Sequence, residues 1–269
     1  MTTPIALTIA GSDSGGGAGI QADLKTFSAL GVYGASVIAA LTAQNTKGVS
    51  GIFDVAPEFV RAQMDAVYSD IKVGATKIGM LARAGVIEAV AEGLRVHKAK
   101  NIVLDPVMIA TSGDLLLAPD AIDTLKKRLI PLALVITPNL AEAAALSGTA
   151  QAKSEAAMAK QGEAILKLGA NSVLVKGGHF ESDQATDLLI DKDGIRRFAA
   201  RRIDSKNTHG TGCTLSSAIA AGLAHGMPLT ESIAIAKKYV SEAIAASGGL
   251  NVGEGRGPVH HFYGWWKKG

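Results

Sequence analysis

The chain of 269 residues has a single cysteine, almost no excess of either charge and no long apolar run. One cysteine excludes an intrachain disulfide, which suits a reducing compartment and predicts a cytoplasmic protein. The 27 Lys and Arg residues against 24 Asp and Glu give a net charge of +3, which is too balanced to indicate a nucleic-acid partner. No stretch approaches the roughly 20 apolar residues of a membrane helix, so we expect no membrane association. The N-terminus lacks a basic region, and its short apolar run predicts a strand and not a signal peptide.

One common nucleotide-binding signature is absent, and a second occurs only in a weak form. The dipeptide Gly-Lys occurs nowhere, so the chain has no P-loop. Residues 17–22 match the dinucleotide pattern G-x-G-x-x-A, but these glycines stand several residues beyond the first expected strand. No Asp or Glu occurs in residues 24–53, where that pattern requires an acidic residue. The sequence therefore argues against an NAD(P) oxidoreductase. We interpret the glycine-rich loop as a pocket wall that can admit a phosphate.

Short apolar runs alternate with helical patterns along the whole chain, and its 48% hydrophobic and 19% charged residues are typical of a globular protein. We expect strands at residues 5–10, 35–43, 76–81, 101–107, 132–137, 172–175 and 187–191, and helices at 19–30, 57–69, 84–98, 119–130, 140–147, 154–168, 213–224 and 229–247. This alternation predicts an α/β fold with three layers, in which helices cover both faces of a mostly parallel sheet. Without a linker or a repeat, residues 1–269 are interpreted as one domain. Ligands of such sheets bind at the carboxyl ends of the strands.

The segment Asn-Thr-His-Gly-Thr-Gly-Cys at 207–213 is the strongest candidate for a binding site. It follows a basic, extended run at 195–203 and precedes an apolar stripe of helical period formed by Leu215, Ile219 and Leu223. A glycine-rich turn that opens into a helix N-terminus presents unpaired N–H groups and positive partial charge, and therefore holds anions. Cys213 stands at that helix start, where a thiolate is favoured. The alternative is a loop with a small buried cysteine.

Polar residues that follow the other strands extend this site. Gln44 follows the second strand, and a side-chain amide can pair with an aminopyrimidine edge, although an ordinary loop glutamine is the alternative. Met80 either packs on a ring or belongs to the core. Asp23 is either a ligand or a first-turn helix charge. Lys176, followed by two glycines and His179, can reach a phosphate.

Oxygen ligands for Mg²⁺ are expected from Asp105, Asn139 and Glu142. Asp105 follows the fourth strand, and Asn139 and Glu142 stand three residues apart at a helix start, which places them on one face. Mg²⁺ keeps several waters and needs few protein ligands, so such a set is sufficient. The alternative is a capping box formed by Asn139 and Glu142, and the two interpretations are compatible.

Six segments together resemble the hydroxymethylpyrimidine/phosphomethylpyrimidine kinases of thiamine biosynthesis, in the ribokinase-like superfamily. They are residues 10–23, 43–45, 104–108, 137–142, 175–179 and 207–213, and they span nearly the whole chain in the expected order. The resemblance implies ATP and Mg²⁺ as cofactors, a pyrimidine alcohol as substrate and a homodimer.

The resemblance also implies a role for each site residue. Gly210, Thr211 and Gly212 would form an anion hole for the transferring phosphoryl group, with Thr208 and Lys176 on the nucleotide phosphates. Gln44 would bind the aminopyrimidine, and the residues around that ring would be Gly11, Asp23, Met80 and Val107. Asp105 and Glu142 would order Mg²⁺ and its waters.

Two features depart from the wider superfamily. The superfamily carries Asp where this chain has Cys213, so we expect Cys213, as a thiolate of lowered pKa, to accept the proton of the substrate hydroxyl. A ribokinase-type lid of β-strands has no evident counterpart in the sequence. A pyridoxal or pyridoxine kinase is the alternative enzyme, because that ring also bears a hydroxymethyl group. A nucleotide-binding sensor is the non-enzymatic alternative.

We predict that Gln44→Ala weakens binding of the pyrimidine and leaves ATP binding nearly intact. A bidentate amide–base pair contributes roughly 1–3 kcal/mol, and the substitution removes both of its hydrogen bonds. Titration calorimetry with each ligand measures the two affinities. An unchanged affinity for the pyrimidine would show that Gln44 is a structural residue.

Overall fold

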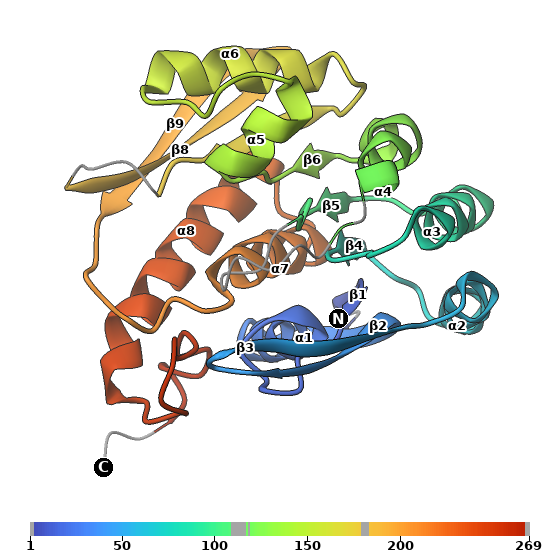
Figure 1. Cartoon of the computed structure of the whole chain (residues 1–269), viewed down its shortest axis with the longest axis horizontal. Helices are drawn as coiled ribbons and strands as arrows, with labels where there is room; N and C mark the ends of the chain where they lie inside the picture. Colours follow the sequence, from blue (N-terminus) through green and yellow to red (C-terminus); the bar gives the residue numbers. More distant parts are fainter. Residues whose placement is uncertain (1–2, 109–116, 118, 179–182, 267–269) are drawn as a thin grey trace.

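The computed structural model describes residues 3–108, 117, 119–178 and 183–266 of the chain. Within these residues, nine strands form one sheet in the order β3-β2-β1-β4-β5-β6-β7-β8-β9 (Figure 1). The strands are β1 Ile5–Gly11, β2 Tyr33–Asn45, β3 Gly48–Asp54, β4 Ala75–Ile78, β5 Ile102–Leu104, β6 Val135–Ile136, β7 Ser172–Lys176, β8 Gln184–Asp191 and β9 Gly194–Arg201. The central strands, β2, β1, β4, β5, β6 and β7 in their order across the sheet, are parallel. Strand β3 is antiparallel to β2, β8 is antiparallel to β7, and β9 is antiparallel to β8. The expected mostly parallel sheet is confirmed.

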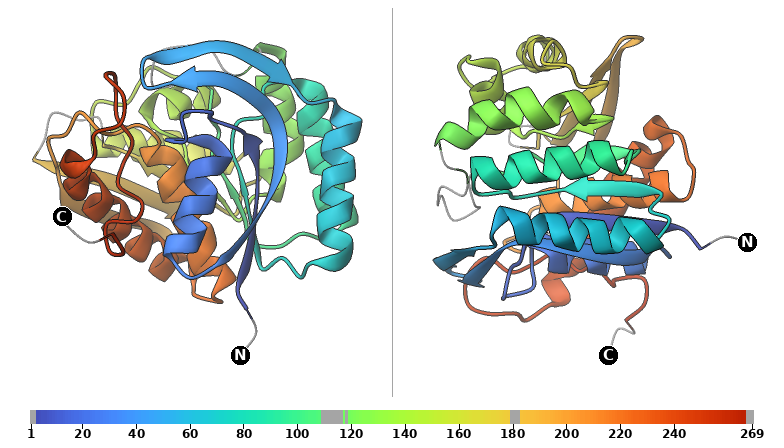
Figure 2. Two further views of the ribbon diagram at one scale, coloured as in Figure 1. Left: turned by 90° about the horizontal axis from the view of Figure 1, so that it is seen from below. Right: turned by 90° about the vertical axis from the view of Figure 1, so that its right-hand side faces the viewer.

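Helices cover both faces of this sheet (Figures 1 and 2). They are α1 Gly19–Ala29, α2 Pro57–Asp70, α3 Ala84–Val96, α4 Pro119–Thr124, α5 Leu140–Ser147, α6 Glu155–Leu166, α7 Thr211–Ala224 and α8 Leu229–Ala246. Phe27 of α1, Ile219 of α7 and Tyr239 of α8 belong to one buried core, whereas α2 to α6 contribute to a larger core on the opposite face. The three layers match the expected architecture. No helix of the described residues is long and apolar enough to span a bilayer.

Strand β1 shows how the sequence places residues on the two faces. Successive side chains of a strand point to opposite sides. Leu7 and Ile9 belong to the larger core, and Ala6 belongs to the core beneath α1 and α7. Thr8 is on the same side as Ala6, and it is completely buried. Because helices cover both faces, the central strands are apolar throughout, as the continuous apolar runs of the sequence predict.

The predicted boundaries differ from the observed ones mainly where prolines occur. Strand β5 ends at Leu104 and not at residue 107, because Pro106 has no N–H group for a ladder. The helix expected at 119–130 ends as α4 at Thr124 and continues as a π-helical turn, Leu125–Leu129, and a 3₁₀ turn, Ile130–Leu132. Pro131 in that last turn cannot donate a helical hydrogen bond.

The hairpin of β2 and β3 was not among the elements predicted from the sequence. Strand β3 pairs with β2 in antiparallel register, from Ala40 opposite Asp54 to Asn45 opposite Gly48. We missed β3 because two glycines interrupt its apolar pattern, and glycine is depleted in strands. The hairpin brings Gln44 to the edge of the sheet, close to its own turn.

Candidate active site

A cleft of about 970 Å³ lies at the carboxyl ends of the parallel strands. Residues from β1, β2, β4 and β7, from the segment that follows β5 and from the starts of α5 and α7 are among those that line it. Thirteen of the fourteen residues predicted for the site line this cleft: Gly11, Gln44, Met80, Asp105, Val107, Asn139, Glu142, Lys176, Thr208, Gly210, Thr211, Gly212 and Cys213. His179, also singled out from the sequence, lies outside the described residues. Asp23 is the exception.

The expected anion-binding turn is present, and its helix begins two residues earlier than predicted. Helix α7 starts at Thr211, after Gly210 in the left-handed conformation with φ +80°. A Cβ atom on Gly210 would lie 1.9 Å from the carbonyl oxygen of Gly17, so only glycine fits there. Gly212 and Cys213, in the first turn of α7, line the cleft, and the N–H groups of a first turn have no partner within the helix. This geometry can hold an anion.

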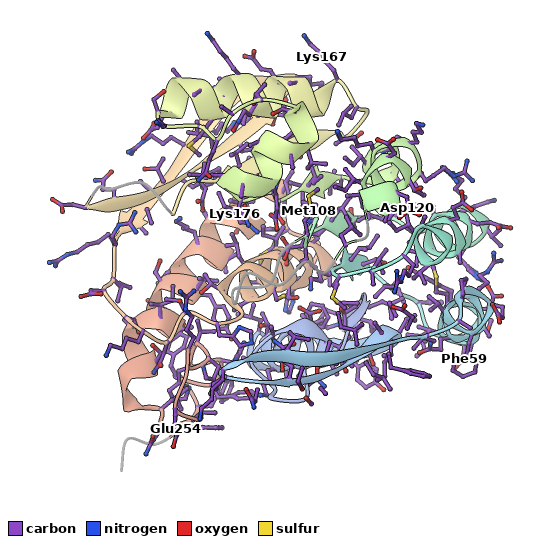
Figure 3. The ribbon with its side chains drawn as sticks, viewed as in Figure 1. Phe59, Met108, Asp120, Lys167, Lys176 and Glu254 are labelled. Carbon is purple, nitrogen blue, oxygen red and sulfur yellow. The ribbon has the colours of Figure 1, made fainter. Side chains whose placement is uncertain are left out.

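Lys176 reaches the same turn from β7. A Cβ atom on Gly212 would lie 3.3 Å from Lys176 Nζ, so the ammonium group lies directly against the start of α7. Lys176 Nζ forms an ion pair with Asp105 Oδ1 at 2.9 Å. Figure 3 shows Lys176 in the interior of the molecule, in contrast to Phe59 and Glu254 at its periphery. The cation and the helix N-terminus therefore share one anion site.

Asp105 is buried, and its carboxylate accepts hydrogen bonds from several side chains. Its carboxylate accepts hydrogen bonds from Thr137 Oγ1 at 3.2 Å and from Ser216 Oγ at 3.2 Å, besides the Lys176 pair. Burial alone would raise the pKa of Asp105, but the Lys176 and Lys77 ammonium groups outweigh it and hold the pKa below its usual value. Asp105 is therefore ionised at neutral pH.

Asn139 and Glu142 form the capping box that the sequence suggested as an alternative. Asn139 Oδ1 accepts from the Glu142 N–H at 2.9 Å, and Glu142 Oε2 accepts from the Asn139 N–H at 2.8 Å. Burial and the nearby Asp105 raise the pKa of Glu142 to about 7, although Lys176 opposes this shift. A buried carboxylate next to another carboxylate gains from a bound cation. The expected Mg²⁺ role stays a prediction.

Cys213 differs from its expected chemical state. Burial raises the pKa of the thiol to about 11, and Asp23 and Asp105 add to this shift, whereas Lys77 and the Gly19 N–H lower the pKa. The expectation of a thiolate is therefore wrong for the free protein, because desolvation outweighs the helix N-terminus. At neutral pH a thiol of this pKa is protonated and cannot accept a proton.

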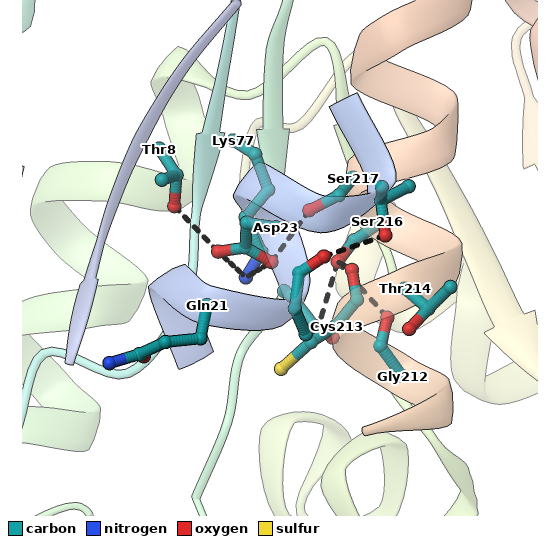
Figure 4. Close-up of polar contacts among 12 residues, drawn as sticks. Thr8, Gln21, Asp23, Lys77, Gly212, Cys213, Thr214, Ser216 and Ser217 are labelled. Atoms are coloured by element: carbon teal, nitrogen blue, oxygen red, sulfur yellow. Dashed lines mark hydrogen bonds and ion pairs between the residues drawn. The ribbon is translucent and has the colours of Figure 1, made fainter. Parts of the chain in front are cut away.

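Asp23 lies beneath the cleft, where no ligand reaches it. Its carboxylate is completely buried between β1, β4 and α7 (Figure 4). It accepts hydrogen bonds from Thr8 and Ser217 and forms an ion pair with Lys77. The expectation that Asp23 contacts the substrate is therefore wrong, and the alternative of a first-turn helix charge is also wrong, because α1 begins at Gly19 and has no acidic residue in its first turn. Sequence position alone could not reveal Lys77 as its partner, because 54 residues separate the two.

Two residues that sequence reasoning missed join the glycine-rich loop to the anion turn. The Asp13 carboxylate accepts from the N–H groups of Gly15, Gly17 and Ala18 and lies 2.9 Å from His209 Nε2. Burial would raise the pKa of Asp13, but the contact with His209 and the backbone donors lower it. An Asp within a glycine-rich loop, which commonly bonds nearby amides, was the available signal.

The surroundings of Gln44 hold its side chain in place. Its backbone N–H donates to Ser14 Oγ at 2.8 Å, and Oε1 lies 3.2 Å from Thr42 Oγ1. The amide nitrogen lies 3.4 Å from His209 Nε2, so Gln44 approaches the residue that precedes the anion turn. A Cβ atom on Gly11 would lie 2.4 Å from Met80 Cε, so the absence of a side chain there leaves room for Met80.

Comparison with known proteins finds one family. The model of the phosphomethylpyrimidine kinase family matches residues 13–260. A hydroxymethylpyrimidine/phosphomethylpyrimidine kinase of Rhizobium meliloti is 63% identical over 98% of this chain and 99% of its own length. The crystal structure of phosphomethylpyrimidine kinase from Clostridium difficile is 47% identical, with a TM-score of 0.80 over 89% of this chain and 99% of that one. A Staphylococcus aureus pyridoxal kinase in complex with AMP-PCP and pyridoxal is 33% identical, with a TM-score of 0.89 over 98% and 95% of the two chains.

Proposed function

The chain belongs to the phosphomethylpyrimidine kinase family, and we propose on that premise that its cleft phosphorylates 4-amino-5-hydroxymethyl-2-methylpyrimidine and then the resulting monophosphate. The phosphoryl donor is ATP, and the diphosphate serves thiamine biosynthesis. The observation that carries the proposal is the common cleft of Gln44 on one side and of Lys176 with the start of α7 on the other. Residues 1–269 form one kinase domain in this proposal, and the match of the family model to residues 13–260 supports it.

The phosphate side of the cleft supports transfer from a nucleotide. The Lys176 ammonium group lies against Gly212 in the first turn of α7, and developing negative charge would be stabilised between the cation and the helix start. Thr208 lines the cleft just before that turn and completes the nucleotide site. A related kinase, 33% identical, has been solved with the ATP analogue AMP-PCP.

The pyrimidine side is formed by Gln44 with Gly11, Met80 and Val107 around the ring. The protonated Cys213 thiol supplies no base for the substrate hydroxyl. Phosphoryl transfer is mainly positioning and charge stabilisation, so the cleft can carry the reaction without a strong base.

We predict rapid ADP release with the pyrimidine alcohol and much slower release with pyridoxal at equal concentration. A coupled ADP-release assay on the purified protein measures both rates, and a reaction without any alcohol gives the background hydrolysis. Faster turnover of pyridoxal would support the pyridoxal kinase alternative. ADP release at the background rate with every alcohol would support a nucleotide-binding sensor.

The carboxylates of the cleft fit Mg²⁺, which would neutralise phosphate charge there. Among the described residues no three His, Cys, Asp or Glu side chains form a metal cluster, and Mg²⁺ in kinases needs only one or two carboxylates besides phosphates. Glu142 and Asp105 are such a pair, and burial of Glu142 beside a second negative charge is relieved by a cation. Asn139 is committed to the helix cap through Oδ1.

We predict that activity requires Mg²⁺ and that Glu142→Gln and Asp105→Asn raise the Mg²⁺ concentration for half-maximal rate. Each substitution removes one negative charge and keeps the side-chain shape. Magnesium titrations in the ADP-release assay give these concentrations. As a control, Asp187→Asn changes a carboxylate elsewhere in the cleft, which is paired with Lys237 at 2.6 Å. Wild-type Mg²⁺ dependence in both test variants would mean that Glu142 and Asp105 serve packing alone.

We also propose that the chain forms a homodimer through the β2–β3 hairpin and works in the cytoplasm, where its single thiol stays reduced. Strand β3 is an edge strand with exposed Ile52 and Phe53, and Leu41 stands opposite Phe53 on β2. An exposed apolar edge favours association with a second chain. Export of the chain in a cell-fractionation experiment would contradict the proposed compartment.

We predict that Phe53→Glu yields a single chain in sedimentation experiments, where the wild type sediments as a dimer. A charge on the edge strand opposes strand association. Ile195→Glu, on the opposite edge strand β9, is the matched control and leaves the dimer intact. A monomeric wild type, or equal sedimentation of the Phe53 variant and the wild type, rejects this interface.

A further inference from the structure

A completely buried ion pair beneath the cleft plays no part in the reaction as described so far. Lys77 Nζ lies 2.8 Å from each oxygen of the Asp23 carboxylate, and neither side chain is exposed to solvent. Thr8 Oγ1 and Ser217 Oγ each donate to this carboxylate at 2.6 Å (Figure 4). The pair thus connects β1, α1, β4 and α7.

Stability alone does not account for this pair. Taking two charges out of water costs several kcal/mol each, and well-packed apolar residues of similar volume are often as stable or more so. A buried pair at a cleft floor is therefore a candidate for a role in the chemistry of that cleft.

The pair is oriented, with its positive end toward the cleft. Lys77 forms part of the cleft floor, and Asp23 does not line the cleft at all. A Cβ atom on Gly79 would lie 2.8 Å from Lys77 Nζ, so the ammonium group lies against the end of strand β4. Asp23 is held on the far side by its bond to Ser217, in the second turn of α7.

The Cys213 thiol is affected by both charges of this ion pair. Cys213 lies in the first turn of α7, four residues before Ser217, and lines the same cleft as Lys77. Lys77 lowers the pKa of the thiol more than Asp23 raises it, as expected when the cation is nearer. The other charges around this turn are Asp105 from β5 and its partner Lys176 from β7.

We propose that Lys77 is a positioning residue for phosphoryl transfer, because Asp23 holds its ammonium group under the first turn of α7 and the positive end of the pair faces the anion site. This inference rests on the proposed function, which places the transferring phosphoryl group at that turn. A preorganised charge in a site without water costs no reorganisation during the reaction. The Lys77 ammonium group thus supplements the positive charge of Lys176, which lies against the same helix start.

The experiment uses the only cysteine of the chain as a reporter of local charge. Iodoacetamide reacts with the thiolate, so the alkylation rate below the pKa follows the thiolate fraction. Rates are measured against pH in the free wild-type protein and in the Lys77→Met, Asp23→Asn and Thr8→Val variants. Thr8→Val is the matched control, because it removes one hydrogen bond to Asp23 and no charge.

The two charge variants are expected to shift the thiol in opposite directions. Asp23→Asn leaves the cation unopposed, so alkylation at neutral pH becomes about tenfold faster, which corresponds to a fall of one unit in the thiol pKa. Lys77→Met removes the nearer charge, so alkylation becomes slower. Thr8→Val stays close to the wild type. A purely structural pair would loosen the turn in every variant, and faster alkylation in all three would overturn the proposal.

Binding of AMP-PCP separates this inference from the proposed function. Lys77→Met is expected to bind AMP-PCP about tenfold more weakly than the wild type in titration calorimetry, and Thr8→Val to bind it equally well. If the wild type binds AMP-PCP and Lys77→Met binds it as tightly, the positioning role is wrong. If the wild type binds no AMP-PCP, the proposed function fails, while the alkylation rates still decide the orientation.

A double variant covers the case in which one charge variant does not fold. Asp23→Asn combined with Lys77→Met leaves no unpaired buried charge, which is the strongly destabilising situation. Because the nearer positive charge dominates in the wild type, the double variant is expected to be alkylated more slowly and to bind AMP-PCP more weakly. Wild-type values for both quantities would overturn the proposal.

Discussion

The candidate site depends on how the first two turns of helix α7 are fixed between two lysine–carboxylate pairs, of which Asp23–Lys77 is completely buried. Ser217 donates to the carboxylate of the Asp23–Lys77 pair, and Ser216 donates to that of the Asp105–Lys176 pair. Consecutive residues of a helix point about 100° apart, so two neighbouring serines reach two different pairs. Breaking a buried pair by removing one partner costs about 3–5 kcal/mol, so this anchorage is rigid. The anion-binding turn at Gly210 is held in place as well, because Gly210 is the N-cap of α7.

A second set of contacts joins the two sides of the cleft. The N–H group of Arg256, in the C-terminal segment, donates to the Thr46 carbonyl oxygen in the β2–β3 turn at 2.9 Å. The neighbouring Gly257 accepts from the His209 N–H at 3.1 Å. This segment therefore connects the hairpin that carries Gln44 with the turn that precedes α7. Holding the two sides at a constant separation is what a transfer reaction requires, since reacting atoms must meet within about 3–3.5 Å.

Cys213 and Asp23 show where a prediction from local sequence position fails. A cysteine at a helix start is expected to ionise easily, but Cys213 is only partly exposed and stands at the end of a buried helix. In this protein α7 is enclosed by the sheet, α1 and α8, and every residue from Thr214 to Leu223 is buried. Desolvation then outweighs the helix N-terminus, and the pKa of the Cys213 thiol rises to about 11. Asp23, which follows a glycine-rich loop, was assigned to the cleft, but its side chain is completely buried beneath the cleft, where it forms an ion pair with Lys77.

The sequence by itself determined the α/β class and the order of the helices and strands apart from β3 and β9, and thirteen of the fourteen residues that pattern and family resemblance predicted for the site line the cleft. It could do so because hydrophobic periodicity is local and parallel strands bring their carboxyl ends to one edge. Only the tertiary structure decided which charges meet. Lys77 with Asp23, Asp13 with His209 and Lys237 with Asp187 are far apart in the chain. Only tertiary structure decided the raised pKa values of Cys213 and Glu142 as well, because burial is a property of the packed molecule and no short segment encodes it.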